Sequence, residues 1–473
     1  MVDLNSRGAW QPATALLPPI PAPPRIVRVR GPATSQPPAL AAPHPPGSKY
    51  YTLRYLLNAL LADGESVVRG PALSDDTAVL VRALRALGAG VVWERHASDP
   101  SDWQLRVRGT GGRLRAPPDG VIQAGNAGAV LRLLLGIAAL LPRARFETDH
   151  PGSLGRRPNA DLLAALSALG LTIQAGEPDG RLPITLAGGP PLGGAVAVSG
   201  ARSSQYLSAL LYLAPLLPRG LDITVIETLR SAPLVRATLR ALDEAGIAVE
   251  AAPDLMRFHV PGGQTFQPRV YDVPGDGPSA AALVCAALAL GTPLRLGRLD
   301  AGADDVRALV DALRALGAPL TATPDDSGGA LAVAGDARLT GAVVDGDACI
   351  DSVPALVATA CSAAGASRFE NVATLRLKES DRISDLAAEL NRAGGDVTPL
   401  ADAILVRGRP EGIAGGATVD AHDDHRLAQA LAIAALRARG GLTITGADAV
   451  AKSYPWFFDD LARMGAQVTV LEE

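Results

Sequence analysis

Several basic side chains stand where a short loop leads into a predicted helix. The segment Pro46-Gly47-Ser48 precedes Lys49, and Arg54 lies about one and a half turns further along the apolar helical pattern that follows. Free backbone N–H groups at a helix start favour an anion, and Lys49 adds a full positive charge. The ATP-binding pattern GxxxxGK[ST] is absent, so nucleotide binding is not indicated. The plainer alternative is an N-cap followed by a solvated lysine.

Three further loop-to-helix junctions carry residues that could bind an anionic ligand. Gly125 and Gly128, three residues apart at a predicted helix start, allow a ligand to approach the backbone closely. Arg157 stands before a proline in a loop, and its guanidinium suits bidentate binding of phosphate or carboxylate. Residues 203–205, Ser-Ser-Gln, open an apolar helix and suit a polyhydroxylated, anionic ligand. A tight turn, a solvated arginine and a helix cap are the respective alternatives.

A mixed cluster of charges follows Leu377. Lys378 and Arg382 are four residues apart, which predicts that they share one helix face. Like charges at this spacing repel, so an anion or an acidic partner would stabilise the pair. Glu379 beside them is a candidate general acid or base. The alternative is a charged and solvated helix face.

Two more cations precede predicted helices near the C-terminus. Arg426 follows two aspartates and a histidine, and Lys452 lies in the segment Ala451-Lys452-Ser453. Neither HExxH nor another metal-ligand spacing occurs here, so we predict no metal site. The aspartates can cap the helix and leave Arg426 free. For both cations, a capped helix start with a solvated side chain is the alternative.

Taken together, these cations predict a strongly positive pocket if they converge. Two unit charges about 4 Å apart interact by about 4 kcal/mol at an effective dielectric constant near 20. A dense cluster of this kind needs a multiply anionic ligand, or several anions. The predicted members are Lys49, Arg54, Arg157, Lys378, Arg382, Arg426 and Lys452.

The elements that must position these residues form a repeat. A helical pattern that ends in a glycine, followed by a short strand-like segment, occurs six times at intervals of 71 to 82 residues. Each glycine is placed to stop a helix in the left-handed conformation. Units of this length are small α/β subdomains, and six of them indicate two globes of three units each. The alternative is a generic α/β protein with chance matches. The glycines are Gly88, Gly170, Gly246, Gly317, Gly394 and Gly465.

The composition argues against a nucleic-acid-binding protein and against a membrane protein. The 473 residues are 48% hydrophobic, which is enough for a large core. The net charge of −4 and the 4% aromatic content argue against nucleic-acid binding. No apolar stretch is long enough for a membrane helix, and no signal peptide is apparent, so we expect a cytoplasmic protein. The three cysteines lack CxxC spacing and are expected to be buried free thiols.

Eight ordered motifs resemble those of the 5-enolpyruvylshikimate-3-phosphate (EPSP) synthase family. They are PGSK, GNAG, RP, SSQ, VPGD, LKESDR, DDHR and AKSYP, and they extend from about Pro46 to the C-terminus. The resemblance implies an α/β fold of two globular domains, each of three βαβαββ units arranged like an inside-out barrel and joined by two crossovers. The implied domains are 25–47 with 270–473 (domain I) and 48–269 (domain II). The Pro-rich residues 1–24 are expected to be disordered.

The resemblance also implies the reaction. Phosphoenolpyruvate would be joined to the 5-hydroxyl of shikimate 3-phosphate through a tetrahedral intermediate that loses phosphate. The implied catalytic residues are Asp351, which accepts a proton, Glu379, which donates one, and Lys49, which contacts both substrates. No cofactor, metal, nucleic acid or membrane is implied, and a monomer is expected.

The same resemblance implies the residues that bind each substrate. Phosphoenolpyruvate would contact Lys49, Gly128, Arg157, Gln205, Arg382, Arg426 and Lys452. Shikimate 3-phosphate would contact Lys49, Tyr50, Arg54, Ser203, Ser204, Gln205, Ser231, Asp351, Thr374 and Lys378.

Four residues depart from the commonest family pattern, and two other functions remain as alternatives. Tyr50 and Thr374 can still donate hydrogen bonds through their side chains, whereas Ala129 and Leu234 cannot.

One alternative function is enolpyruvyl transfer to UDP-N-acetylglucosamine, whose enzymes usually carry a cysteine in the loop corresponding to residues 150–157. None of the three cysteines of this chain lies there. The other alternative is an anion-binding paralogue without catalytic activity.

Overall fold

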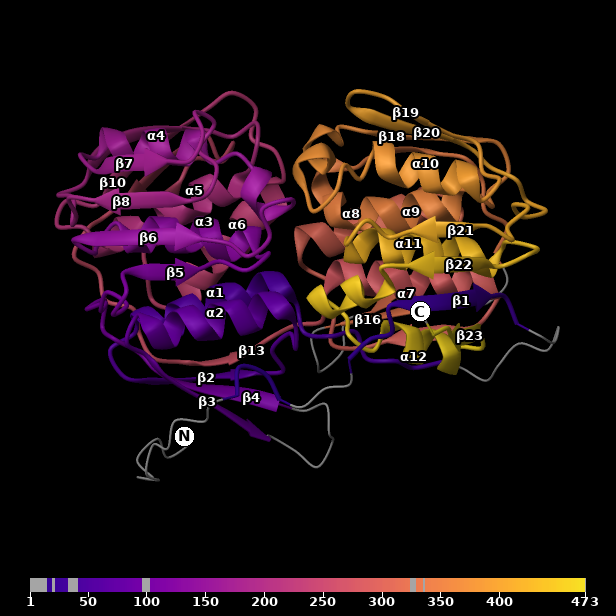
Figure 1. Ribbon diagram of the computed structural model, residues 1–473, viewed down its shortest axis with the longest axis horizontal. Coiled ribbons are helices and arrows are strands. Elements are labelled where there is room, and N and C mark those ends of the chain that lie inside the picture. The colour runs from indigo at the N-terminus through magenta and orange to yellow at the C-terminus, as the bar shows by residue number, and fades with distance from the viewer. Residues whose placement is uncertain are drawn as a thin grey trace. The chain divides into compact units, whose positions relative to one another are not determined.

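The computed structural model describes residues 15–18, 22–32, 41–95, 103–323, 329–334 and 337–472, and these fall into two compact units (Figure 1). Unit 1 comprises Met1–Pro19 and Lys49–Val273, and unit 2 comprises Ile20–Ser48 and Pro274–Glu473. Each unit contains three sheets. The predicted α/β class with three βαβαββ repeats in each half is therefore confirmed.

Unit 1 is built from sheets ordered β13-β2-β4-β3, β5-β6-β8-β7 and β11-β12-β10-β9. Its helices are α1 (Lys49–Leu61), α2 (Asp75–Ala86), α3 (Gly128–Ala138), α4 (Ala160–Ala168), α5 (Ser204–Leu213) and α6 (Ala232–Glu244), with short 3-10 turns η1 (Leu154–Arg156) and η2 (Ala214–Leu216). Its strands are β2 (Glu65–Arg69), β3 (Gly90–Arg95), β4 (Trp103–Arg108), β5 (Val121–Gln123), β6 (Arg143–Glu147), β7 (Thr172–Ala175), β8 (Ile184–Ala187), β9 (Gly194–Ser199), β10 (Leu221–Ile226), β11 (Glu250–Ala251), β12 (Arg257–Val260) and β13 (Val270–Asp272).

Unit 2 repeats this plan with sheets ordered β14-β16-β15, β17-β18-β20-β19 and β21-β22-β1-β23. Its helices are α7 (Gly277–Leu290), α8 (Asp304–Ala315), α9 (Val353–Ala360), α10 (Ser384–Arg392), α11 (His425–Leu436) and α12 (Phe457–Arg463), with 3-10 turns η3 (Asp347–Ser352), η4 (Ala373–Leu377) and η5 (Ala447–Lys452). Its strands are β1 (Ile26–Arg30), β14 (Leu294–Leu296), β15 (Leu320–Thr323), β16 (Ala330–Val333), β17 (Val343–Asp345), β18 (Ala366–Glu370), β19 (Val397–Pro399), β20 (Ala403–Arg407), β21 (Thr418–Asp420), β22 (Leu442–Thr445) and β23 (Gln467–Val470).

Segments remote in sequence complete three of the sheets. In unit 1, β13 pairs in parallel with β2. In unit 2, β1 lies antiparallel between β22 and β23, and Ala41 forms a parallel bridge to Leu294 of β14. Two of these sheets thereby gain a strand, and the third gains a single bridging residue, from a remote stretch of the chain. The domain boundaries implied by the resemblance stay a prediction.

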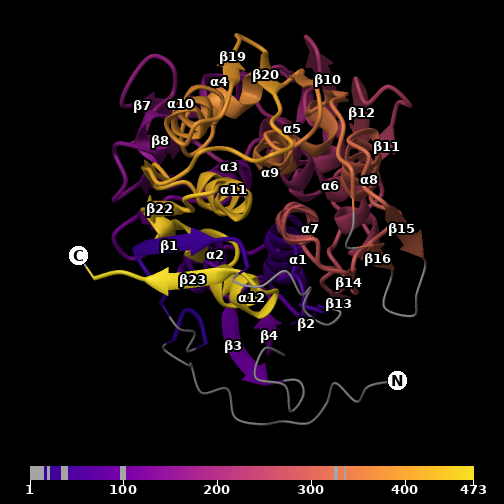
Figure 2. The same cartoon turned by 90° about the vertical axis from the view of Figure 1, so that its right-hand side faces the viewer.

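In unit 2, entirely buried helices alternate with amphipathic helices along the chain. Helices α7, α9 and α11 are entirely buried, contact one another, and lie inside a ring of unit 2 strands (Figure 2). The helix that follows each of them is amphipathic, with charged residues on the outer face. The six predicted glycines follow α2, α4, α6, α8, α10 and α12, and their φ angles lie between 80° and 106°. The predicted left-handed helix stops are therefore confirmed.

The Pro-rich start of the chain is described only in part. Residues 1–14 and 19–21, on which most of the expected disorder falls, lie outside the described residues. The carbonyl oxygens of Ala15 and Leu16 accept hydrogen bonds from Arg85 and from the indole of Trp93, each at 3.0 Å. Among the described residues, no helix is long and apolar enough to cross a membrane.

Candidate active site

The charged segment after Leu377 is a loop and not the predicted helix. The turn η4 ends at Leu377 and α10 begins only at Ser384, so Lys378 and Arg382 lie between the two. The expectation of a shared helix face is wrong. A carboxylate brings the two cations together instead, because Oδ1 of Asp351 accepts a hydrogen bond from each of them at 2.9 Å.

Arg382 is the centre of this arrangement. Its side chain is 1% exposed, and its guanidinium donates to three carboxylates. Nε donates to Oδ2 of Asp424 at 2.7 Å, Nη1 to Asp351 at 2.9 Å, and Nη2 to Oε2 of Glu379 at 2.7 Å. A planar guanidinium with donors in a fixed fork sets the directions of all three acids. Arg382 thus fixes the positions of both predicted acid–base residues.

The two predicted acid–base carboxylates have different neighbours. Burial alone would raise the pKa of Asp351, but the charges of Lys378, Arg382 and Arg426 overcome this effect and lower its pKa well below the usual range. Glu379 lies between Arg382 and Lys452, whose Nζ is 3.3 Å from Oε1. Two carboxylates in unlike surroundings suit a reaction that removes one proton and delivers another.

Arg426 is not free, contrary to the sequence expectation. Asp424 does cap α11, since its Oδ1 accepts the Arg426 N–H at 2.8 Å. The Arg426 side chain, however, is 3% exposed and pairs through Nη2 with Oδ2 of Asp276 at 3.3 Å. Asp276 is the N-cap of α7 and comes from the VPGD motif. Sequence reasoning quoted this motif but gave Asp276 no role.

The cations of the unit 2 cluster are paired with carboxylates, and the convergence of all seven predicted cations in one positive pocket stays a prediction. Each of its four cations forms at least one ion pair with a buried carboxylate. Cations brought this close would otherwise repel, and nearby carboxylates offset that repulsion inside the protein. The cations are Lys378, Arg382, Arg426 and Lys452, and the carboxylates are Asp276, Asp351, Glu379 and Asp424.

In unit 1, two of the predicted cations, Lys49 and Arg54, lie on α1. Lys49 is the first residue of α1, and its Nζ lies 3.1 Å from Oδ2 of Asp76 on α2. Arg54, 5% exposed, donates to the Thr238 hydroxyl and to the carbonyl oxygens of Tyr50 and Leu234, each at 2.9 Å. These hydrogen bonds tie α1 to α6. Arg54 is thus engaged within the fold of unit 1.

The start of α5 is organised by an arginine that sequence reasoning missed. Ser203 caps α5 as expected, accepting the Gln205 N–H at 3.3 Å. Nη1 of Arg132 donates to Oε1 of Gln205 at 2.8 Å and to Oγ of Ser203 at 3.5 Å, and its Nε donates to Asn159. Its guanidinium also lies 5.2 Å from the Tyr206 ring centre. The available signal was that Arg132 is the single charged residue in an otherwise apolar helix, one turn after Gly128.

Gly128 and Arg157 lie against each other. A Cβ atom at position 128 would be 2.8 Å from Nη1 of Arg157, closer than van der Waals contact allows. The missing side chain thus makes room for the guanidinium. Gly128 begins α3, and Arg157 follows the turn η1, so two loop-to-helix junctions meet at this point. The structure brings together two residues that both belong to the predicted phosphoenolpyruvate site.

Two predicted residues have unusual local states. Ser231 is the N-cap of α6 with φ of +54°, a left-handed conformation that costs a non-glycine residue free energy and clusters at functional sites. Thr374 in η4 is 8% exposed, and its Oγ1 has no hydrogen-bond partner among the described residues. Ser204 is buried on α5, and its carbonyl oxygen accepts a hydrogen bond from Ser208 at 3.2 Å.

The predicted residues divide between the units. Nine lie in unit 1 and seven in unit 2, and the charged members of the second set take part in the ion pairs described above. That the two sets meet around the same ligands stays a prediction. The unit 1 members are Lys49, Tyr50, Arg54, Gly128, Arg157, Ser203, Ser204, Gln205 and Ser231, and the unit 2 members are Asp351, Thr374, Lys378, Glu379, Arg382, Arg426 and Lys452.

Comparison with known proteins decides the family. The profile described as EPSP synthase (3-phosphoshikimate 1-carboxyvinyltransferase) matches residues 42–461. A 3-phosphoshikimate 1-carboxyvinyltransferase of Deinococcus radiodurans is 45% identical over 427 residues, which cover 90% of this chain and 93% of the relative. The chain belongs to the EPSP synthase family. An enzyme of the same name from Burkholderia pseudomallei is 34% identical over 89% of this chain and 91% of its own length.

Solved structures agree with this assignment. The EPSP synthase of Acinetobacter baumannii superposes with a TM-score of 0.76 at 27% identity, covering 94% of this chain and 99% of that one. The enolpyruvyl transferase NikO of Streptomyces tendae has a TM-score of 0.70 at 18% identity, covering 95% of this chain and 99% of that one. The second likeness shows the fold alone.

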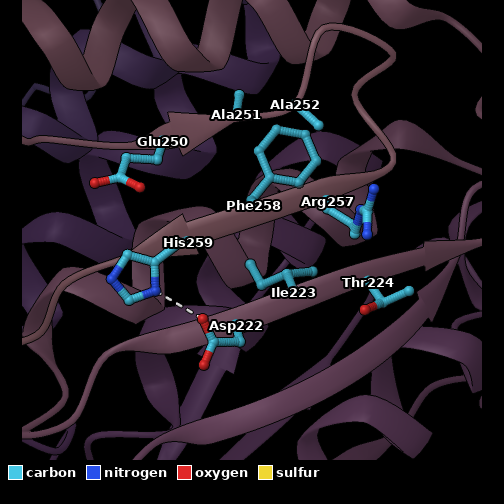
Figure 3. Close-up of a pocket in the computed structure, with 9 residues that line it drawn as sticks. All are labelled: Asp222, Ile223, Thr224, Glu250, Ala251, Ala252, Arg257, Phe258 and His259. Carbon is cyan, nitrogen blue, oxygen red and sulfur yellow. Dashed lines mark hydrogen bonds and ion pairs between the residues drawn. The ribbon is translucent and has the colours of Figure 1, made fainter.

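Unit 1 of this EPSP synthase family member has a surface hollow whose lining contains none of the predicted residues. The hollow has a volume of about 410 Å³ and lies over β10, β11 and β12 (Figure 3). Within it, Nδ1 of His259 is 2.6 Å from Oδ1 of Asp222, and this hydrogen bond raises the pKa of His259. None of the predicted site residues lines the hollow. The described residues contain no group of three His, Cys, Asp or Glu side chains suited to a metal ion, and the three cysteines are buried and free.

Proposed function

We propose that this protein transfers the enolpyruvyl group of phosphoenolpyruvate to the 5-hydroxyl of shikimate 3-phosphate and releases phosphate. The observation that carries the proposal is the placement of Asp351 and Glu379 on two donors of one buried arginine, Arg382. This reaction needs two carboxylates with different tasks. The names of the curated relatives support the choice of substrates.

In the first step, Asp351 accepts the proton of the 5-hydroxyl while Glu379 delivers a proton to the methylene carbon of phosphoenolpyruvate. The hydroxyl oxygen forms a bond to the neighbouring carbon, which gives a tetrahedral intermediate. Loss of phosphate and of a proton from the new methyl group then restores the double bond. Glu379 is placed to take that proton back, because the group that donates in one direction accepts in the other.

The low pKa of Asp351 fits a base that becomes stronger once ligands bind. Lys378, Arg382 and Arg426 hold its pKa down in the unliganded protein. Phosphate and carboxylate groups of the substrates would neutralise part of these charges and raise the pKa toward its usual value. Asp351 would thus become a better proton acceptor when both substrates are present.

The anionic groups of the substrates account for the cations in both units. We assign phosphoenolpyruvate to Lys49, Arg157 and Gln205 of unit 1 with Arg382, Arg426 and Lys452 of unit 2. We assign shikimate 3-phosphate to a set that shares Lys49 and Gln205 with the phosphoenolpyruvate site and also contains Tyr50, Arg54, Ser203, Ser204, Ser231, Asp351, Thr374 and Lys378. The proposal requires the two units to close around the ligands. A monomeric state and a cytoplasmic location belong to the same proposal.

The deciding experiment measures phosphate release from phosphoenolpyruvate with shikimate 3-phosphate as acceptor. We expect turnover that depends on both substrates, with the carboxyvinyl ether identified by mass spectrometry. Matched reactions omit the acceptor or replace it with UDP-N-acetylglucosamine, and these should release no phosphate. Tight binding of both ligands without phosphate release would support a non-catalytic paralogue and contradict the proposal. Small-angle scattering should show compaction when both substrates are added, and unchanged dimensions would argue against closure.

A further inference from the structure

Helix α11 contains one residue that its surroundings do not explain. All twelve residues of α11 are buried, and the helix packs against α7, α9, α10 and η5. After Arg426, the helix is apolar except for Gln429, which is 1% exposed. A buried primary amide is costly unless its donors and acceptor all find partners.

The amide of Gln429 is only half satisfied. Its Oε1 accepts a hydrogen bond from Nη1 of Arg426 at 3.1 Å. Its Nε2 is buried without a hydrogen-bond partner among the described residues. An apolar side chain of the same length would avoid this unpaired donor. Core stability therefore does not explain a glutamine at this position, and its contact with Arg426 is the remaining explanation.

Gln429 completes a clamp on the Arg426 guanidinium. Nη1 donates to Gln429, and Nη2 pairs with Oδ2 of Asp276 at 3.3 Å. The third nitrogen, Nε, is buried and has no partner in the described part of the chain. With both terminal nitrogens held, rotation of the guanidinium would break two hydrogen bonds. The clamp fixes the plane of the guanidinium and the direction in which Nε–H points.

We propose that Gln429 is a positioning residue that orients Arg426 for the anion of phosphoenolpyruvate. The inference rests on the proposed function, because it takes Arg426 as a phosphoenolpyruvate ligand. Preorganised donors bind an anion without a cost of reorientation at the moment of binding. A neutral amide clamps the guanidinium without cancelling its charge, whereas Asp276 on the other side does offset it. The two arms of the clamp therefore have different effects on anion affinity.

The test is Gln429→Met, which keeps the length of the side chain and removes both the acceptor and the unpaired donor. Calorimetry with phosphoenolpyruvate alone, which cannot turn over without an acceptor, should show a Kd raised about 5- to 10-fold. The KM for shikimate 3-phosphate should not change, and Tm should stay the same or rise. Leu431→Met introduces the same residue at another buried position of α11 and should leave all three values unchanged.

A double-mutant cycle with Arg426→Lys separates positioning from packing. If Gln429 acts through the guanidinium, Gln429→Met should weaken phosphoenolpyruvate binding no further in the Arg426→Lys background. An unchanged Kd in the single variant, or an equal loss in both backgrounds, would overturn the inference. The proposed function fails separately, through absence of phosphate release by the unaltered protein, and absence of phosphoenolpyruvate binding would overturn both.

Discussion

Arg382 of unit 2 differs from Arg54 and Arg132 of unit 1 in the acceptors of its hydrogen bonds. In unit 2, the guanidinium of Arg382 donates to the carboxylates of Asp351, Glu379 and Asp424. In unit 1, the hydrogen bonds described for Arg54 and Arg132 end on hydroxyl, amide and carbonyl oxygens. Neutral acceptors fix a guanidinium without cancelling its charge, whereas carboxylates fix it and cancel the charge as well.

This difference indicates that the two units have different tasks, namely anion binding and proton transfer. In unit 1, the neutral acceptors of Arg54 and Arg132 hold these guanidinium groups in place, which suits the binding of phosphate and carboxylate groups, while Lys49 pairs with Asp76. Unit 2 places two carboxylates between cations, which suits proton transfer and lets bound anions alter the basicity of Asp351. Four experiments test this contrast.

The largest effect is expected for Glu379→Gln in unit 2. The amide keeps the size of the side chain and can still accept from Arg382, but it cannot deliver a proton to carbon. Turnover should fall by about 10²- to 10⁴-fold with little change in either KM, measured by phosphate release. Glu389→Gln makes the same change at another buried glutamate of unit 2 and should retain most activity. A comparable loss there would assign the effect to a missing buried charge and not to chemistry.

Lys49→Ala tests the anion-binding role of unit 1. Removing the charge that we propose to contact both substrates should lower kcat/KM by about 10²- to 10³-fold. The substitution also breaks the pair with Asp76, so the matched variant is Asp76→Asn, which breaks the same pair from the other side. Asp76→Asn should cost far less activity. Equal losses in the two variants would show that Lys49 acts only through the ion pair.

The charge balance of unit 2 predicts a pH-dependent stability. Because the pKa of folded Asp351 lies well below 3.8, its ionised form stabilises the fold above that pH, and this contribution is lost as the pH falls through the folded-state value. Asp351→Asn should therefore lower the free energy of unfolding by about 3 kcal/mol at pH 7. In denaturant titrations, the difference from the unaltered protein should shrink below about pH 4.

Asp305 provides a control of opposite sign. Burial and the nearby charge of Asp276 raise the pKa of Asp305 to about 6, so its ionised form destabilises the fold above that pH. Asp305→Asn should therefore raise Tm at pH 7 and leave it unchanged near pH 3.5. If both variants shifted Tm in the same direction at pH 7, the charge balance described for unit 2 would be wrong.

The smallest effect is expected for Gly128→Ala in unit 1. The added Cβ would approach Nη1 of Arg157 to 2.8 Å, and the flexible end of the arginine can move by a few tenths of an ångström. Because the guanidinium would then be displaced from its anion, the KM for phosphoenolpyruvate should rise about 2- to 5-fold, with kcat nearly unchanged. Gly152→Ala, where a Cβ would meet nothing within 4 Å and the backbone does not have a positive φ, is the matched control. An unchanged KM for phosphoenolpyruvate would show that Gly128 does not belong to the phosphoenolpyruvate site.

Local patterns predicted the repeating framework well. The six glycine stops are set by backbone sterics within one turn of helix, so they could be identified from the sequence at Gly88 and at its five counterparts. The Ser203 and Asp424 caps are equally local and were predicted for the same reason. The predicted helix through Lys378 and Arg382 is wrong, because spacing alone does not distinguish a helix from a loop that a carboxylate holds together.

The sequence by itself determined the repeat, the family and the types of side chain available for binding and proton transfer, because these depend on short-range patterns and on residue identity. Only the tertiary structure decided how the charges are paired. Asp351 and Asp424 are 31 and 42 residues from Arg382, and Asp276 is 150 residues from Arg426, so folding alone brings these pairs within hydrogen-bond distance. Arg132 and Gln429 acquire their roles in the same way, since contacts between helices cannot be seen in the pattern of any one helix.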